Sequence, residues 1–137
     1  MDKIKLEIAV FSVEAALAAI EAGADRIEFC ENPQEGGTTP SFGSLSTLIS
    51  LTSKPVFPII RPRGGDFLYT KNEFNAMSSD VLMARKLDYP GFVIGLLNQD
   101  GSIDGVCPAT ATAGLLLPGF PPAGACPAVA TDAPSPK

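Results

Sequence analysis

Two arginines and an aspartate stand where an apolar run of the chain ends. Residues 56–60 are apolar, and Arg61, Arg63 and Asp66 follow them, the last two separated by a Gly-Gly pair. Buried strands are apolar, so charged side chains at the end of one serve a binding site or a buried ion pair. Arginine also offers a rigid planar fork that fits carboxylate or phosphate groups. We therefore expect Arg61 and Arg63 to bind a small anionic ligand or a buried carboxylate.

Strands and helices alternate along the first three quarters of the chain. The apolar patterns predict four strands, at residues 3–10, 26–30, 55–61 and 91–97. Three helices are predicted between them: one capped by Ser12 and ended by Gly23, one beginning at Thr39 and Pro40 and running to about residue 52, and one from Thr70 to near residue 87 with Phe74, Met77, Val81 and Leu82 directed inward. Such a parallel series fits an open doubly wound sheet or part of a (βα)8 barrel.

The remaining residues, 105–137, have a different character. They are rich in Ala, Pro and Gly and include seven prolines between Pro108 and Pro136, which would interrupt any helix or strand. We therefore divide the chain into an α/β domain at residues 1–104 and an irregular or disordered tail at residues 105–137.

Composition excludes several classes of function. The net charge is −5 and no basic cluster is present, which argues against a nucleic-acid surface. No apolar run approaches the roughly 18 residues that a membrane span needs, so a cytoplasmic protein without membrane partners is expected. The chain has no histidine and three widely spaced cysteines, which fits neither a disulfide framework nor a zinc ribbon.

Several short sequence motifs resemble motifs of the CutC family of copper-homeostasis proteins. They cover most of residues 1–104 in order, and they are Leu6-Glu7-Ile8, Ser12-Val13-Glu14-Ala15-Ala16, Gly23-Ala24-Asp25-Arg26-Ile27-Glu28, Glu35-Gly36-Gly37-Thr38-Thr39-Pro40-Ser41 and Ile60-Arg61-Pro62-Arg63-Gly64-Gly65-Asp66-Phe67-Leu68-Tyr69. The resemblance implies a (βα)8 barrel of the TIM type, of which this chain would supply the N-terminal half. A family member would continue through four further strands, so the tail looks like an altered reading frame, a splice variant or a mispredicted gene end. One hypothesis is therefore a truncated, inactive product.

In such a barrel, alternation along each strand decides which side chains face the axis. Glu7, Glu28 and Arg61 would face it together, with Cys30 and Arg63 nearer the carboxyl ends, where the sites of this fold lie. One interpretation is a structural ion-pair network, because buried carboxylates need a partner. The other is an enzyme acting on a small anionic or sugar-like substrate, with Glu28 as the catalytic base and Arg61 as a catalytic anion holder assisted by Arg63.

The resemblance to CutC also points to Cys30 as a copper ligand. A thiolate is the soft donor that Cu(I) prefers, although one thiolate does not make a site. The candidates for a second soft ligand are another chain's Cys30, a methionine such as Met77 or Met83, and the tail residues Cys107 and Cys126. The alternative is an inert buried cysteine.

Two further expectations concern a loop and the assembly. Gly36 and Gly37 precede a helix, where backbone N–H groups could hold an anion. Half of a barrel would leave unpaired strand edges and uncovered apolar surface, so we expect a homo-oligomer that pairs half-barrels.

Overall fold

Four parallel strands alternate with three α-helices in the computed structural model. The elements are β1 (Glu7–Val10), α1 (Val13–Glu21), β2 (Arg26–Phe29), the short 3₁₀ helix η1 (Pro33–Glu35), α2 (Phe42–Leu51), β3 (Val56–Ile60), α3 (Lys71–Lys86) and β4 (Val93–Ile94). The structure describes residues 4–104, so the predicted tail, including Cys107 and Cys126, lies outside the described residues. Within residues 4–104, no helix is both long and apolar enough to cross a membrane.

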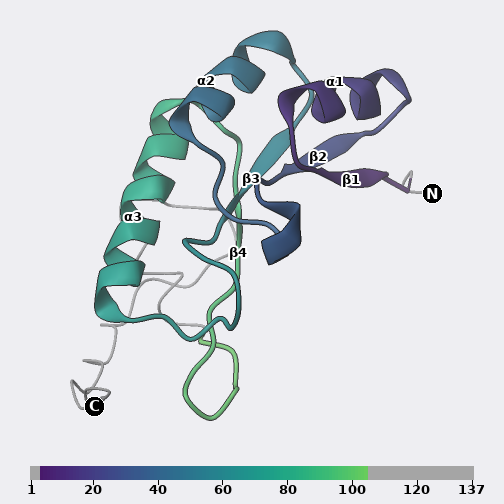
Figure 1. Cartoon of the computed structure of the whole chain (residues 1–137). Coiled ribbons are helices and arrows are strands. Elements are labelled where there is room, and N and C mark those ends of the chain that lie inside the picture. The colour runs from purple at the N-terminus through teal and green to yellow at the C-terminus, as the bar shows by residue number, and fades with distance from the viewer. Residues whose placement is uncertain (1–3, 105–137) are drawn as a thin grey trace.

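The order of the strands decides between the two predicted architectures. The sheet runs β1-β2-β3-β4, each strand parallel to the next. Figure 1 shows the three α-helices along one side of the strands. A doubly wound sheet reverses its strand order and carries helices on both faces, whereas a barrel keeps sequence order with helices outside. The described part is therefore built like half of a (βα)8 barrel, as the resemblance implied.

The strands bury alternate residues against the helices. Val10, Ile27, Phe29, Val56 and Ile60 are buried, whereas their neighbours in the sequence on the strands are more exposed. The core against α1 and α2 adds Ala16, Leu45 and Leu48, and a second cluster on α3 adds Met77 and Val81. The predicted inside-outside phase of all three strands is confirmed, and Glu7, Glu28 and Ile59 lie on the side away from the helices.

The start of α2 was predicted two residues too early. Its N-cap is Ser41, whose Oγ accepts a hydrogen bond from the Ser44 amide at 3.1 Å. Thr39 instead bonds the end of β3, because its amide donates to the Arg61 carbonyl at 2.8 Å and its hydroxyl accepts from the Arg61 amide at 2.9 Å. The caps of the other helices are confirmed, with Ser12 before α1 and a Thr70–Glu73 capping box before α3.

Two other predictions are corrected. Leu82 is 51% exposed rather than inward, because Phe74, Met77, Val81 and Ala84 already complete the stripe of α3 that packs on the sheet. Strand β4 has two residues instead of the seven predicted at 91–97. Its backbone leaves β3 after Ile94, and the Leu97 amide donates to the Phe67 carbonyl at 3.0 Å.

A buried tyrosine ties the end of α3 to α2. The Tyr89 hydroxyl donates to the Leu45 carbonyl at 2.9 Å, and burial raises the pKa of Tyr89 to about 12. Tyr89→Phe keeps the ring and loses only this bond, so we expect the free energy of unfolding to fall by about 1 kcal/mol in urea titrations. Tyr69→Phe is the matched control, since the buried Tyr69 hydroxyl donates no hydrogen bond among the described residues. Equal losses in both variants would contradict this assignment.

Candidate functional site

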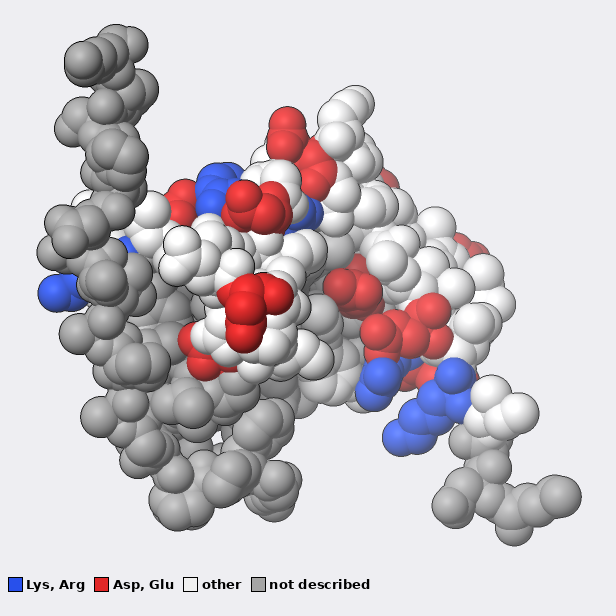
Figure 2. Space-filling model, turned by 90° about the horizontal axis from the view of Figure 1, so that it is seen from below, with Lys and Arg blue, Asp and Glu red and all other residues white. Residues whose placement is uncertain are grey.

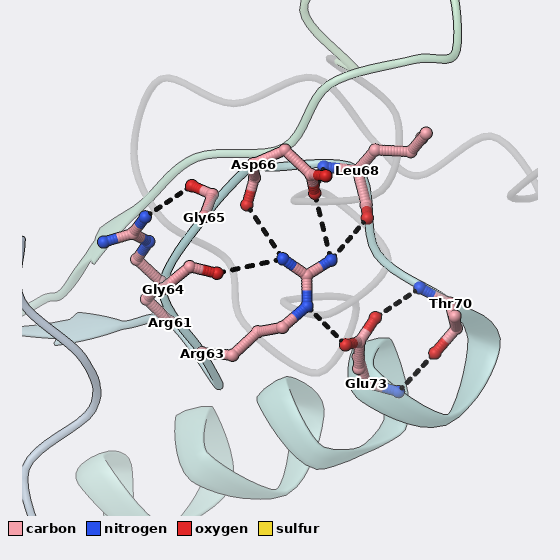
Figure 3. Close-up of polar contacts among 8 residues, drawn as sticks. All are labelled: Arg61, Arg63, Gly64, Gly65, Asp66, Leu68, Thr70 and Glu73. Carbon is pink, nitrogen blue, oxygen red and sulfur yellow. Dashed lines mark hydrogen bonds and ion pairs between the residues drawn. The ribbon is translucent and has the colours of Figure 1, made fainter. Parts of the chain in front are cut away.

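Arg61 is a buried cation at the carboxyl end of β3. The residue is only 7% exposed, and its guanidinium donates hydrogen bonds to three backbone carbonyls. Nη1 donates to Glu35 at 2.7 Å and to Gly37 at 3.0 Å, and Nη2 donates to Gly65 at 2.7 Å, as Figure 3 shows for Gly65. The Phe67 ring lies over the guanidinium, 4.7 Å from its central carbon to the ring centroid. Arg61 therefore joins the loop after β2 to the loop after β3.

In the loop that contains Gly36 and Gly37, backbone carbonyls accept hydrogen bonds from Arg61, whereas the amides of the two glycines donate within the loop itself. Both glycines have positive φ, 75° and 97°, which lets the chain turn tightly after η1. The Gly36 amide donates to the Pro33 carbonyl at 3.1 Å and the Gly37 amide to the Asn32 carbonyl at 3.2 Å. The expectation that these two amides hold an anion is therefore wrong, because the turn already uses them.

Arg63 is occupied by its own loop and by α3. Nε donates to Glu73 at 2.6 Å, Nη1 donates to the carbonyls of Gly64 and Asp66, and Nη2 donates to the Asp66 carboxylate and the Leu68 carbonyl. Figure 3 shows this fan of contacts around one guanidinium. Because each of its nitrogens already has a partner, Arg63 is a structural clamp, and its predicted anion-binding role is not supported.

The carboxylates around Arg63 are held in their charged forms. Glu73 also accepts from the Thr70 amide at 2.7 Å, so the clamp includes the capping box of α3. Hydrogen bonds from Arg63, followed by the Thr70 amide, lower the pKa of Glu73, and Arg63 with the Leu68 amide lowers the pKa of Asp66. Both groups are therefore ionised at neutral pH, and they neutralise Arg63 locally.

The predicted axial cluster of Glu7, Glu28 and Arg61 is not formed. Glu7 pairs with Arg26, its neighbour in register on β2, and the Arg26 guanidinium lies 5.4 Å from the Phe57 ring centroid. The alternation was right about the face, but the register separates the charges. Glu28 is level with Phe57, and Arg61 is four residues further along the chain, roughly 13 Å at strand spacing.

Glu28 is half-buried and faces the axis. Within residues 4–104, no hydrogen bond or ion pair to its carboxylate is found. Its electrostatic neighbour is Cys30, whose pKa it raises. The structure thus brings Glu28 toward the cysteine rather than toward Arg61.

Cys30 lies directly after β2, covered by the same loop that Arg61 holds. It is 3% exposed, and a Cβ added to Gly37 would stand 3.3 Å from its sulfur. Burial and then the charge of Glu28 raise the pKa of Cys30 to about 11. The group is therefore a protonated thiol at neutral pH and lacks the lowered pKa of a reactive nucleophile.

Neither predicted methionine accompanies Cys30. Met77 is buried with Ile60 and Val81, and Met83 packs against the cluster that contains Phe29, so both lie in the helix-facing core. Cys30 follows Phe29 along the strand, so its side chain points to the opposite face of the sheet, away from the helices. Across residues 4–104, no group of three or more His, Cys, Asp or Glu side chains is placed to hold a metal ion.

Sequence reasoning missed the residues that surround Arg61. Tyr69 is 8% exposed beside the guanidinium, and Phe67 covers it. The aromatic residues shortly after the Gly-Gly pair were a usable signal, since rings favour arginine faces. The carbonyl partners left no signal, because any residue type supplies a carbonyl.

The two arginines should differ sharply in their effect on stability. Arg61→Met removes the buried guanidinium that donates to three backbone carbonyls, of which that of Gly37 is buried, so we expect a loss of about 3 kcal/mol in the free energy of unfolding. Arg63→Met removes contacts that are largely solvent-exposed, so its effect should be much smaller. Urea titrations of both variants compare them, and a larger loss for Arg63→Met would show that the clamp has been assigned to the wrong arginine.

The chain matches one protein family over most of its length. The model of the CutC family matches residues 4–113. A CutC family protein of Proteus mirabilis (strain HI4320) is 54% identical over 100 residues, covering 73% of this chain and 40% of the relative. One of Klebsiella pneumoniae (strain 342) is 54% identical over 99 residues, covering 72% and 40%. The chain thus spans about 40% of the length of these relatives.

Solved structures share the fold described above. A Streptococcus agalactiae protein, provisionally described as the copper homeostasis protein CutC, superposes with a TM-score of 0.73 at 32% identity, covering 82% of this chain and 57% of that one. A protein of Burkholderia cenocepacia J2315, provisionally described as a phosphonomutase, has a TM-score of 0.55 at 15% identity and shows the fold alone. From the family match, the close relatives and the shared half-barrel, this chain belongs to the CutC family.

Proposed function

We propose that this chain handles intracellular Cu(I) as cargo, with the Cys30 sulfur as a ligand. The observation that carries the proposal is the position of Cys30, a soft donor at the carboxyl edge of the sheet in a CutC family chain. Cu(I) prefers thiolate ligands over the carboxylates of acidic side chains. The compartment we propose is the cytosol, where thiols stay reduced.

One sulfur is too few for Cu(I), so we propose that a second copy of the chain supplies another Cys30. Met77 and Met83 lie in the helix-facing core and do not compete for this role. Within residues 4–104, no strand pairs with the outer edge of β1 or β4, which favours association of two copies. The complex would then bind one Cu(I) between two chains.

The surface charge supports a small cargo rather than a nucleic acid. Figure 2 shows acidic side chains spread over one face, with basic groups only in small separate patches among the coloured residues. This agrees with the net charge of −5. Polyanions would be repelled by such a face.

The enzyme alternative has less support. Arg63 and the amides of Gly36 and Gly37 are occupied within the protein, and Glu28 is not level with Arg61. Glu28 remains a candidate base only for a substrate bound near Cys30. The third hypothesis, an inactive product, predicts aggregation in place of a defined copper complex.

Copper stoichiometry tests the proposal. In a Cys107→Ser, Cys126→Ser background, we expect one Cu(I) for every two chains, measured by native mass spectrometry under anaerobic conditions. Adding Cys30→Ser should abolish this binding while far-UV circular dichroism is unchanged. Met77→Leu is the matched control and should bind normally. Stoichiometric copper in the Cys30→Ser variant would exclude this site.

The pH dependence of affinity gives a second test. Each coordinating thiol loses a proton, so two thiols should raise the apparent affinity about a hundredfold per pH unit below their pKa. Because the pKa of Cys30 is raised to about 11, from an ordinary value of 9.0, the rise should continue beyond pH 9. Competition with a Cu(I) chelator measures it, and Glu28→Gln should bind more tightly at neutral pH. An affinity that levels off below pH 9 would contradict the buried thiol.

A further inference from the structure

An open groove lies between α1 and α2, the two helices that Figure 1 shows side by side. Its volume is about 520 Å³. This size falls within the range of small-molecule sites, roughly 300 to 1,000 Å³. Neither Cys30 nor Arg61 lines the groove, so it is distinct from the candidate site described above.

One end of the groove is acidic. Glu14, in the first turn of α1, and Glu31, shortly after β2, both line it near the carboxyl ends of the strands. Within residues 4–104, no ion pair to either carboxylate is found, and no lysine or arginine of these residues lines the groove. The described part of the chain therefore supplies no basic side chain to balance these two carboxylates.

The hydrogen bonds around Glu31 leave acceptors rather than donors for a ligand. Glu31 Oε1 accepts from the Ser44 hydroxyl at 2.5 Å, and Oε2 accepts from the Ser41 amide at 3.1 Å. Because Ser44 gives its single hydroxyl proton to Glu31, the Ser41 hydroxyl is the donor in its 3.0 Å contact with Ser44 Oγ. A ligand beside Glu31 and Ser44 thus meets oxygens that can only accept, which favours a ligand with N–H donors and positive charge.

The wall of the groove becomes apolar along the helices. Leu17, in the second turn of α1, and Leu51, the last residue of α2, line it, and Leu51 is 54% exposed. From Ser44 to Leu51 the helix rises about 10 Å, which matches a hydrocarbon chain of several carbons.

An aromatic ring adds to the acidic end. Phe11 follows β1, lines the groove and is 38% exposed. The loop after β2 supports this ring, because a Cβ added to Gly37 would stand 3.7 Å from Phe11 Cε1. The face of a phenyl ring attracts cations, so Phe11 favours the same kind of ligand as the two carboxylates.

We propose that the groove between α1 and α2 binds a small primary alkylamine in its ammonium form. The ammonium group lies at the acidic end, where the Glu14 and Glu31 carboxylates and Ser44 Oγ accept its hydrogen bonds. The alkyl chain extends along the helices and removes Leu17 and Leu51 from water. The site uses neither Cys30 nor Glu28, so it does not depend on the copper proposal.

A titration of the full chain with n-hexylamine, followed by ¹H–¹⁵N NMR at pH 7, tests the proposal. The amine is protonated at this pH. We expect saturable shifts of the amides of residues 12–17 and 43–51. Hexanol and hexanoate carry a similar chain with a neutral or negative head group and should cause no saturable shift there. Ethylamine should bind more weakly, because its chain is too short to cover the leucines. Equal affinity for hexanol, or no saturable shift with hexylamine, would overturn the proposal.

Glu14→Gln is the decisive variant. Glu14 is exposed and forms no ion pair within residues 4–104, so circular dichroism should be unchanged. Its affinity for hexylamine should fall about threefold, as expected for an exposed ion pair. Glu21→Gln is the matched control, since it removes the same charge from the other end of α1, outside the groove, and should bind like the original chain.

Leu51→Ser tests the apolar end and should remove the advantage of hexylamine over ethylamine. Equal hexylamine affinity in the Glu14→Gln and Glu21→Gln variants would overturn the assignment of the acidic end, whatever the result for copper.

Discussion

The carboxyl edge of this half-barrel depends on the bonds between one buried guanidinium and the backbone. Arg61 joins Glu35 and Gly37, after β2, to Gly65, after β3. The main chain of the same residue pairs with Thr39 ahead of α2. A single side chain with donors in a fixed plane can satisfy several carbonyls at once, which a flexible lysine ammonium cannot do with the same geometry. The loops that bound the site are positioned together for this reason.

The neighbouring arginine has a different role although it is only two residues away. Arg63 is partly exposed and neutralised by Asp66 and Glu73, so it holds residues 63–68 against the start of α3. Arg61 is buried, and its guanidinium donates to backbone carbonyls of two loops. The two arginines therefore differ in role because their burial and their hydrogen-bond partners differ, although their residue type is the same.

The loop that follows β2 contacts both Cys30, the proposed copper ligand, and Arg61. The Cα of Gly37 faces the Cys30 sulfur, and the Gly37 carbonyl accepts a hydrogen bond from Arg61. Any side chain at this position would press on the sulfur and strain a backbone with φ of 97°. Glycine at this position therefore permits both contacts. The link is mechanical, since the cysteine and the guanidinium contact the same residue from two directions.

The sequence by itself determined the order of elements, the helix caps at Ser12 and Thr70, and the face of each strand, because periodicity and capping are local. The sequence motifs also identified the family, and the charged residues that follow β3 predicted a polar edge at the end of that strand. Only the tertiary structure decided which charges meet, because register is a relation between strands: it paired Glu7 with Arg26 and kept Glu28 away from Arg61. The carbonyl partners of Arg61 were likewise undetectable beforehand, since backbone groups carry no residue identity and are brought together only by folding.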